Sequence, residues 1–181
     1  MEKLTHEKGE IAKKIKLVIF DVDGVLTDGT LTYGPEGEYV KHFNVKDGLG
    51  LKMLMRHKIG VAVITARESK ALIRRMSDLG IVHFYSDVSN KLDVFGNLLN
   101  DLDVEPAEVA YVGDDVIDLP VMHEVGLSIA VADAHVLVRE DADLVASAKG
   151  GSGAAREVAD FILASRMPLR EVYRNTFSLK N

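Results

Sequence analysis

The chain has 181 residues, 47% of them hydrophobic and 28% charged, which suits one ordinary domain and leaves little room for a second. Its 22 Lys and Arg residues against 28 Asp and Glu residues give a formal net charge of −6, which disfavours nucleic acid as a partner because an acidic surface repels the phosphate backbone. The absence of cysteine excludes disulfides, thiolate metal sites and a cysteine nucleophile.

The composition also bears on location and on ligand type. No stretch approaches the ~18 apolar residues that a membrane span needs, and residues 1–14 carry mixed charge without an apolar segment. We therefore expect a soluble protein of the cytoplasm with no membrane partner. Its chemistry has to come from oxygen and nitrogen atoms, and the many carboxylates favour a hard divalent cation such as Mg²⁺.

Apolar segments of strand length alternate with helical patterns along the whole chain. Leu72, Met76 and Leu79 share one helical face, and a second face holds Leu92, Phe95, Leu98 or Leu99, and Leu102. The strands are almost continuously apolar, as expected of strands covered on both faces. The pattern predicts an α/β fold with a doubly wound, mostly parallel sheet. The predicted strands are residues 15–20, 61–64, 81–85, 109–112, 127–131 and, more weakly, 144–146.

The first predicted strand ends in two carboxylates, Asp21 and Asp23, followed by Gly24. Residues i and i+2 of a strand point the same way, so at the carboxyl end both side chains can face one crevice. The simpler interpretation is a pair of polar loop residues. The position at a strand end with a glycine behind it favours a functional pair.

Residues 28–43 interrupt the alternation. Two strand-like stretches flank the turn cluster Gly-Pro-Glu-Gly at residues 34–37. This arrangement predicts a β-hairpin inserted directly after the first strand.

Single polar residues follow the second and third strands. Thr65 comes after residues 61–64, and Lys91 opens the helix that follows residues 81–85. Taken alone, Thr65 reads as a helix cap and Lys91 as a solvated surface charge. Together with a metal, however, a hydroxyl and an ammonium at neighbouring strand ends supply the groups that stabilise a phosphoryl group during transfer.

A second acidic cluster follows the strand at residues 109–112. Asp114 has the same strand-end position as Asp21, while Asp115 and Asp118 fit either a metal site or simple caps of the next helix. Carboxylates from two strand ends form a plausible oxygen-only site for Mg²⁺.

The last part of the chain begins with a glycine-rich segment at residues 150–153, which opens a helix over residues 154–164. Residues 166–181 are polar with scattered apolar positions and are predicted to form a C-terminal tail. No linker or repeat divides the chain, so residues 1–181 are predicted to form a single domain.

The order of these motifs resembles the haloacid dehalogenase superfamily of phosphotransferases: Asp-x-Asp, then Thr, then Lys, then Gly-Asp-Asp-x-x-Asp. The resemblance covers roughly residues 15–131 and implies a Rossmann-like core. It also implies that Asp21 is the nucleophile that forms an aspartyl-phosphate and that Asp23 is the general acid and base. Thr65 and Lys91 would hold phosphate oxygens, with Lys91 also neutralising Asp21.

The same resemblance implies a Mg²⁺ site. Its ligands would be the Asp21 side chain, the Asp23 main-chain carbonyl and Asp114, with Asp115 or Asp118 in support.

Further segments resemble one branch of this superfamily, the phosphatases of 3-deoxy-D-manno-octulosonate (KDO) 8-phosphate and related enzymes that act on 9-phosphates of sialic-type sugars. These segments are the hairpin, FNVKDGLG at residues 43–50, ITAR at residues 64–67 and the glycine-rich residues 149–155. Ala66 stands where the branch usually has glycine. The resemblance implies a phosphatase of KDO 8-phosphate in lipopolysaccharide precursor synthesis, or alternatively of a related sugar 9-phosphate.

Neither gap in which this superfamily usually carries a cap domain can hold one, because residues 23–65 fit a hairpin and one helix and residues 85–109 fit one helix. An open crevice would leave the aspartyl-phosphate exposed to water, so either a macromolecular substrate or a neighbouring subunit is expected to cover it. The exposed strand edges of the hairpin favour the neighbouring subunit. The branch implies a homotetramer in which hairpins assemble and the tail of one subunit reaches another's site. Candidate groups for the carboxylate of a sugar acid are Arg67 and Lys46 and, in the last part of the chain, Arg156, Arg166 or Arg170.

Two other classes compete with this interpretation. A response-regulator receiver domain also uses Asp, Thr, Lys and Mg²⁺, but its phosphorylated Asp follows the third strand, where this chain has only the displaced Asp87. A catalytically silent binding or assembly module is the second alternative, and the four intact motifs count against it.

Overall fold

A computed structural model describes residues 6–177 and shows a six-stranded parallel sheet with strand order β5-β4-β1-β6-β7-β8. The parallel sheet predicted from the apolar segments is confirmed. Its strands are β1 (Leu17–Phe20), β4 (Gly60–Ile64), β5 (His83–Tyr85), β6 (Val109–Gly113), β7 (Leu127–Ala130) and β8 (Leu144–Val145).

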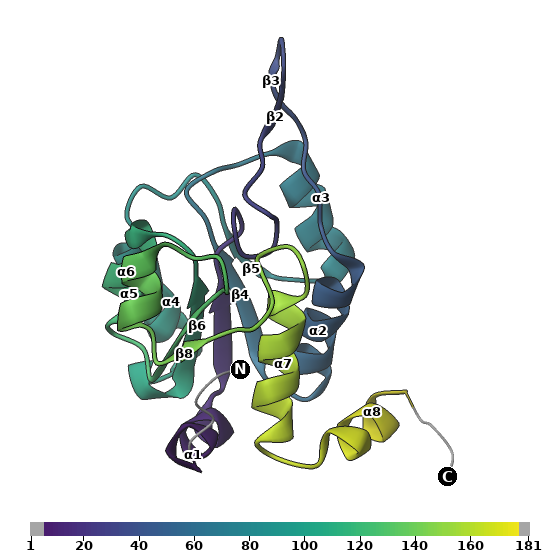
Figure 1. Cartoon of the computed structure of the whole chain (residues 1–181), viewed down its shortest axis with the longest axis vertical. Coiled ribbons are helices and arrows are strands. Elements are labelled where there is room, and N and C mark those ends of the chain that lie inside the picture. Colours follow the sequence, from purple (N-terminus) through teal and green to yellow (C-terminus); the bar gives the residue numbers. More distant parts are fainter. Residues whose placement is uncertain (1–5, 178–181) are drawn as a thin grey trace.

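Helices cover both faces of the sheet (Figure 1). One face carries α2 (Val45–Arg56), α3 (Lys70–Leu79) and α7 (Ala154–Ala164), and the other carries α4 (Lys91–Leu102), α5 (Leu119–Met122) and α6 (Val136–Asp141). The remaining helical segments are α1 (His6–Lys14), α8 (Leu169–Phe177) and the single turns η1 (Pro106–Glu108) and η2 (Val116–Asp118). Among residues 6–177, no helix combines the length and the apolar character needed to cross a lipid bilayer.

Three helices begin directly after a capping residue, and their apolar faces are largely the ones predicted from the sequence. The side chains of Asn44, Ser69 and Asn90 accept backbone N–H groups at the starts of α2, α3 and α4. The predicted face of α3 is confirmed, since Leu72, Met76 and Leu79 are its buried residues. In α4 the prediction is wrong at one position: Leu92 is exposed, and the neighbouring Lys91 is buried instead.

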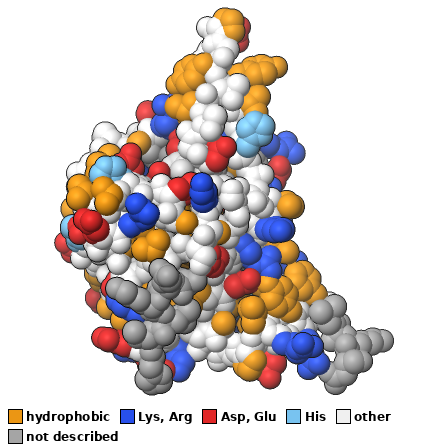
Figure 2. Space-filling model, in the orientation of Figure 1, with side chains coloured by type: hydrophobic (Ala, Val, Ile, Leu, Met, Phe, Trp, Pro, Cys, Tyr) orange, Lys and Arg blue, Asp and Glu red, His pale blue; other side chains and the backbone are white. Residues whose placement is uncertain are grey.

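The hairpin predicted over residues 28–43 is confirmed, with strands β2 (Thr32–Gly34) and β3 (Gly37–Val40) paired antiparallel. It projects from the carboxyl edge of the sheet (Figure 1), and hydrophobic side chains gather along it (Figure 2). Only this hairpin and α2 lie between β1 and β4, and only α4 and η1 lie between β5 and β6. The described chain therefore has no cap domain.

Strand β1 lies between β4 and β6 in the sheet. From β1 the chain continues to β4 and β5 on one side, and it then crosses back to β6 on the other side of β1. The strand order thus reverses between β1 and β6, and in open α/β sheets this switch point is where ligands bind, beyond the carboxyl ends of the strands. The residues that follow β1 and β6 are Asp21 and Asp114.

Most of the described part of the predicted C-terminal tail is helical, because residues 169–177 form α8. Val172 is fully buried and anchors this helix. Tyr173 accepts a hydrogen bond from Arg156 of α7 and donates one to Asp160, 3.0 Å away. The last four residues of the predicted tail, 178–181, lie outside the described part of the chain.

Candidate active site

The loop after β1 is a tight turn that presents Asp21 and Asp23. The hydroxyl of Thr27 accepts hydrogen bonds from the backbone N–H groups of Gly24, at 3.4 Å, and Gly29, at 3.2 Å. Asp21 is buried and Asp23 is half-buried. The loop therefore holds one carboxylate inside the protein and the other near its surface.

Gly24 lets the loop after β6 approach closely. Its φ of +87° lies in the left-handed region, and a Cβ at this position would lie 2.0 Å from Asp114 Oδ2. No side chain fits between the two loops, so Asp114 packs directly on the Gly24 backbone.

We expect Gly24→Ala to lower the free energy of unfolding by about 2 to 4 kcal/mol, because it adds both left-handed strain and a clash with Asp114. It should also weaken Mg²⁺ binding by displacing that carboxylate. Urea unfolding and calorimetric titration with MgCl₂ measure the two effects. Gly80→Ala is the matched control, since Gly80 has a φ of +75° with nothing within 4 Å of a Cβ. Equal losses of unfolding free energy in both variants would mean that the clash with Asp114 does not contribute to the effect.

Asp118 organises the interior of the site. One of its oxygens, Oδ1, lies 2.8 Å from Lys91 Nζ and accepts a 2.6 Å hydrogen bond from the Tyr111 hydroxyl. The other oxygen accepts from the backbone N–H groups of Asp114, at 3.0 Å, and Asp115, at 3.3 Å. Asp118 is fully buried. It therefore fixes both the Lys91 ammonium and the loop that carries Asp114.

Lys91 connects the two acidic motifs. Its Nζ lies 2.8 Å from Asp21 Oδ1 and 2.8 Å from Asp118 Oδ1, and its side chain is buried. Burial opposes the charge of this ammonium, but Asp21 and Asp118 outweigh that effect and raise the pKa of Lys91. Lys91 thus stays cationic and offsets part of the negative charge around Asp21.

Asp21, Asp114 and Asp118 each offer a carboxylate oxygen within 4.8 Å of the others. Burial, reinforced by repulsion from Asp118, raises the pKa of Asp21 to about 6. Burial and repulsion from Asp21 and Asp118 raise the pKa of Asp114 to about 8. Crowded carboxylates of this kind gain a compensating charge from a hard cation, and an all-oxygen donor set suits Mg²⁺.

Three further predicted residues, Thr65, Asp115 and Lys46, differ in burial and in the groups they contact. Thr65 is buried at the end of β4, and its hydroxyl accepts a 3.4 Å hydrogen bond from the Arg67 backbone N–H. Asp115 is exposed, and its side chain accepts from the Val116 N–H at the start of η2. Lys46 is also exposed, in the first turn of α2. The structure thus gives Asp115 a capping role and leaves Lys46 outside the carboxylate cluster.

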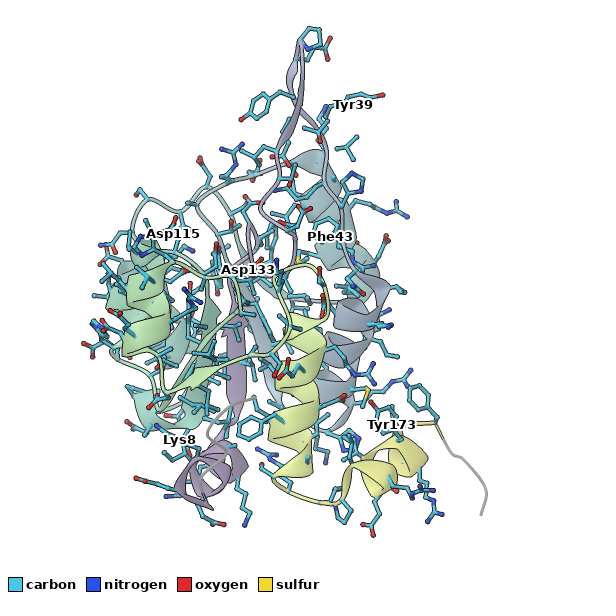
Figure 3. All side chains as sticks on the ribbon, in the orientation of Figure 1. Lys8, Tyr39, Phe43, Asp115, Asp133 and Tyr173 are labelled. Carbon is cyan, nitrogen blue, oxygen red and sulfur yellow. The ribbon has the colours of Figure 1, made fainter. Side chains whose placement is uncertain are left out.

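Arg156 and Arg166, two of the arginines considered in the last part of the chain, are bound to other groups away from the carboxylate cluster. Arg166 donates a hydrogen bond to the carbonyl of Ile15, which precedes β1 at the amino edge of the sheet. Arg156 is engaged with Asp160 and Tyr173. Tyr173 on α8 lies at the end of the molecule opposite Asp115 and Asp133 (Figure 3).

Three residues of the site were not predicted. Tyr111 sits within an apolar strand, where its position alone gives no sign that its hydroxyl reaches Asp118. Lys41 and Glu38 belong to the hairpin, yet Lys41 contacts Asp23, and Glu38 contacts Lys41 and Arg67. The only hint of their role in the sequence is the position of Lys41 directly after a short hairpin strand.

Comparison with known proteins agrees with this geometry. The family model for haloacid dehalogenase-like hydrolases matches residues 63–158. A relative from Salmonella typhi named 3-deoxy-D-manno-octulosonate 8-phosphate phosphatase KdsC is 51% identical over 160 residues, which cover 88% of this chain and 85% of the relative.

Two solved structures are also similar. The phosphatase of the same name from Yersinia pestis superposes with a TM-score of 0.89 at 48% identity, covering 91% of this chain and 89% of that one. A Moraxella catarrhalis phosphatase, crystallised with magnesium, phosphate and KDO, gives a TM-score of 0.91 at 37% identity, covering 95% and 99%. The chain therefore belongs to the haloacid dehalogenase-like hydrolases, within the branch of the KDO 8-phosphate phosphatases.

Proposed function

We propose that this protein is a Mg²⁺-dependent phosphatase that hydrolyses KDO 8-phosphate to KDO and inorganic phosphate, a step of lipopolysaccharide precursor synthesis in the cytoplasm. The observation that carries this proposal is the buried Asp21, paired with Lys91 beside Asp114, at the switch point of the sheet. The choice of KDO 8-phosphate as the substrate rests on the names of the relatives described above. Their similarity extends over most of this chain.

In the first step, a carboxylate oxygen of Asp21 attacks phosphorus and forms an aspartyl-phosphate. The bond between phosphorus and the sugar oxygen breaks, and Asp23 donates a proton to that oxygen so that the sugar leaves as an alcohol. Lys91 and the Thr65 hydroxyl stabilise the charge on the phosphoryl oxygens.

In the second step, Asp23, now a carboxylate, takes a proton from water as the water oxygen attacks the same phosphorus. The bond to Asp21 breaks, inorganic phosphate leaves, and both aspartates return to their starting states. Splitting the reaction in this way replaces one difficult displacement with two easier ones.

When bound, Mg²⁺ would neutralise part of the negative charge on the phosphoryl group in both steps. The Asp21 and Asp114 side chains and the Asp23 main-chain carbonyl would hold it. Asp118 is better suited to support, because each of its oxygens already accepts hydrogen bonds from the protein.

Phosphate release from KDO 8-phosphate tests the proposed function. The purified wild type should release phosphate with MgCl₂ and lose at least about 99% of that rate when EDTA removes the metal. Excess MgCl₂ should restore it. A rate that is unchanged by EDTA would exclude a metal-dependent mechanism, and no release under any condition would exclude the substrate.

The substrate carboxylate is proposed to meet Arg67 and Lys46 and, in a homotetramer, the tail of a neighbouring subunit. The exposed Tyr33 and Tyr39 on the hairpin support an assembly surface. The Arg67 side chain is 40% exposed beside Asp23, where a bound ligand can reach it.

Deleting residues 166–181 should lower kcat/KM for KDO 8-phosphate at least about tenfold more than kcat/KM for 4-nitrophenyl phosphate. The reason is that only the sugar acid carries a carboxylate for a neighbour's arginine to bind. Because the deletion also removes the buried Val172, Arg170→Met provides a milder variant, and melting temperatures report on folding. Equal losses for the two substrates would refute a role of the tail in a neighbouring site.

A further inference from the structure

Four charged side chains meet where the hairpin joins the carboxyl edge of the sheet: Asp23, Glu38, Lys41 and Arg67. The side chains of Lys41 and Glu38 are only 3% and 8% exposed, although the hairpin that carries them is largely open to solvent. Buried charges are costly unless they are paired, so their placement requires specific partners.

Lys41 forms the centre of this group. Its Nζ contacts Asp23 Oδ1 and lies 3.0 Å from Glu38 Oε1. Glu38 and Lys41 are three residues apart at the end of β3, so Glu38 holds the ammonium from its own segment while Lys41 reaches across to the loop after β1. One oxygen of Asp23 is thereby fixed.

The second oxygen of Asp23, Oδ2, is not paired in this way. Oδ2 is buried and has no hydrogen-bond partner among residues 6–177. Arg67 Nε lies 3.6 Å from it, which is longer than a normal hydrogen bond. Among residues 6–177, Lys41 therefore gives the Asp23 carboxylate its one side-chain hydrogen bond, while Oδ2 is left without a partner.

We propose that Lys41, held by Glu38, is a positioning residue that orients Asp23 for proton transfer to the leaving group. This inference rests on the proposed phosphatase function. As the bond from Asp21 to phosphorus forms and the bond from phosphorus to the alcohol breaks, the proton on the Asp23 carboxyl group passes to the leaving oxygen. Asp23 becomes a carboxylate and Lys41 balances its new charge. Lys41 itself transfers no proton.

The test compares two simple phosphoesters that lack a sugar and a carboxylate. Benzyl phosphate releases an alkoxide that needs a proton, whereas 4-nitrophenyl phosphate releases an anion that does not. Because kcat/KM covers only the steps up to departure of the alcohol, it isolates the role of Asp23 as an acid. Lys41→Met should lower kcat/KM for benzyl phosphate about 10- to 100-fold and for 4-nitrophenyl phosphate less than about threefold.

Three further variants complete the design. Glu38→Gln should give the same selectivity with a smaller loss, and Lys41→Arg should recover much of the benzyl phosphate activity because it restores the cation. Lys70→Met is the control, since Lys70 is an exposed lysine at the start of α3. Melting temperatures identify any variant that fails to fold, and the remaining variants then decide the question.

Equal losses of kcat/KM for both esters would overturn the proposal, because a general structural defect does not depend on the leaving group. A loss confined to KDO 8-phosphate, with benzyl phosphate unaffected, would overturn it too and would assign Lys41 to sugar binding. A wild type that hydrolyses both simple esters but not KDO 8-phosphate would refute the proposed substrate while leaving the role of Lys41 intact.

Discussion

Asp21→Asn should lower kcat for KDO 8-phosphate by about 10⁴-fold or more, because the amide cannot form the aspartyl-phosphate on which both proposed steps depend. The change is nearly isosteric, and it removes one of three crowded carboxylates. Stability should therefore be unchanged or slightly higher, since Asp21 is buried and its pKa is raised to about 6. Phosphate release and thermal unfolding measure the two effects.

Asp101→Asn provides the matched control for this substitution. Asp101 is exposed near the end of α4, away from the carboxyl edge of the sheet, and its variant should keep wild-type kcat. Substantial turnover by Asp21→Asn, at more than about a hundredth of the wild-type rate, would show that another group is the nucleophile.

Lys91→Met is the substitution with the largest expected effect on stability. It removes a buried cation that lies 2.8 Å from both Asp21 and Asp118 and leaves their carboxylates without it. Removing one partner of a buried ion pair costs about 3 to 5 kcal/mol of unfolding free energy. Turnover should fall by at least about a thousandfold, because Lys91 is also proposed to stabilise the phosphoryl oxygens.

Urea unfolding of the metal-free protein measures the stability loss in Lys91→Met, with the exposed Lys70→Met as reference. The double variant Lys91→Met with Asp118→Asn should recover part of the loss by removing one unpaired charge. Stability equal to the wild type would mean that the three side chains are not energetically coupled.

The positions of the catalytic candidates were predictable because the strands are almost continuously apolar and parallel strands end at one edge. Once the segments before Asp21, Thr65 and Asp114 are read as strands, their side chains must gather there. The pairing of Lys91 with Asp118 could not be predicted in the same way. It depends on how α4 packs against the loop after β6, which is a long-range contact.

The sequence left Asp115 and Asp118 as equal candidates for capping or for support of the metal site. The structure separates them by burial: Asp115 caps η2 from an exposed position, while the buried Asp118 binds Lys91. The hairpin residues Lys41 and Glu38 escaped prediction for another reason. A register shift between Thr32 and Tyr33 breaks the simple alternation of side chains in this short hairpin.

Helix α8 was also missed as a helix, although Leu169, Val172 and Tyr173 stand at the spacing of one helical face within an otherwise polar segment. Val172 buries itself against the domain, and Tyr173 joins Arg156 and Asp160. The contacts with α7 thus stabilise a helix whose apolar spacing is already present in the sequence.

The most direct test of the proposed function is a side-by-side measurement of kcat/KM for KDO 8-phosphate, a sialic-type sugar 9-phosphate and benzyl phosphate, with saturating MgCl₂. We predict that the wild type prefers KDO 8-phosphate over each of the other two by at least about tenfold, and that EDTA abolishes all three activities. Higher kcat/KM for the 9-phosphate, or equal values for all three esters, would contradict the assignment of KDO 8-phosphate as the substrate.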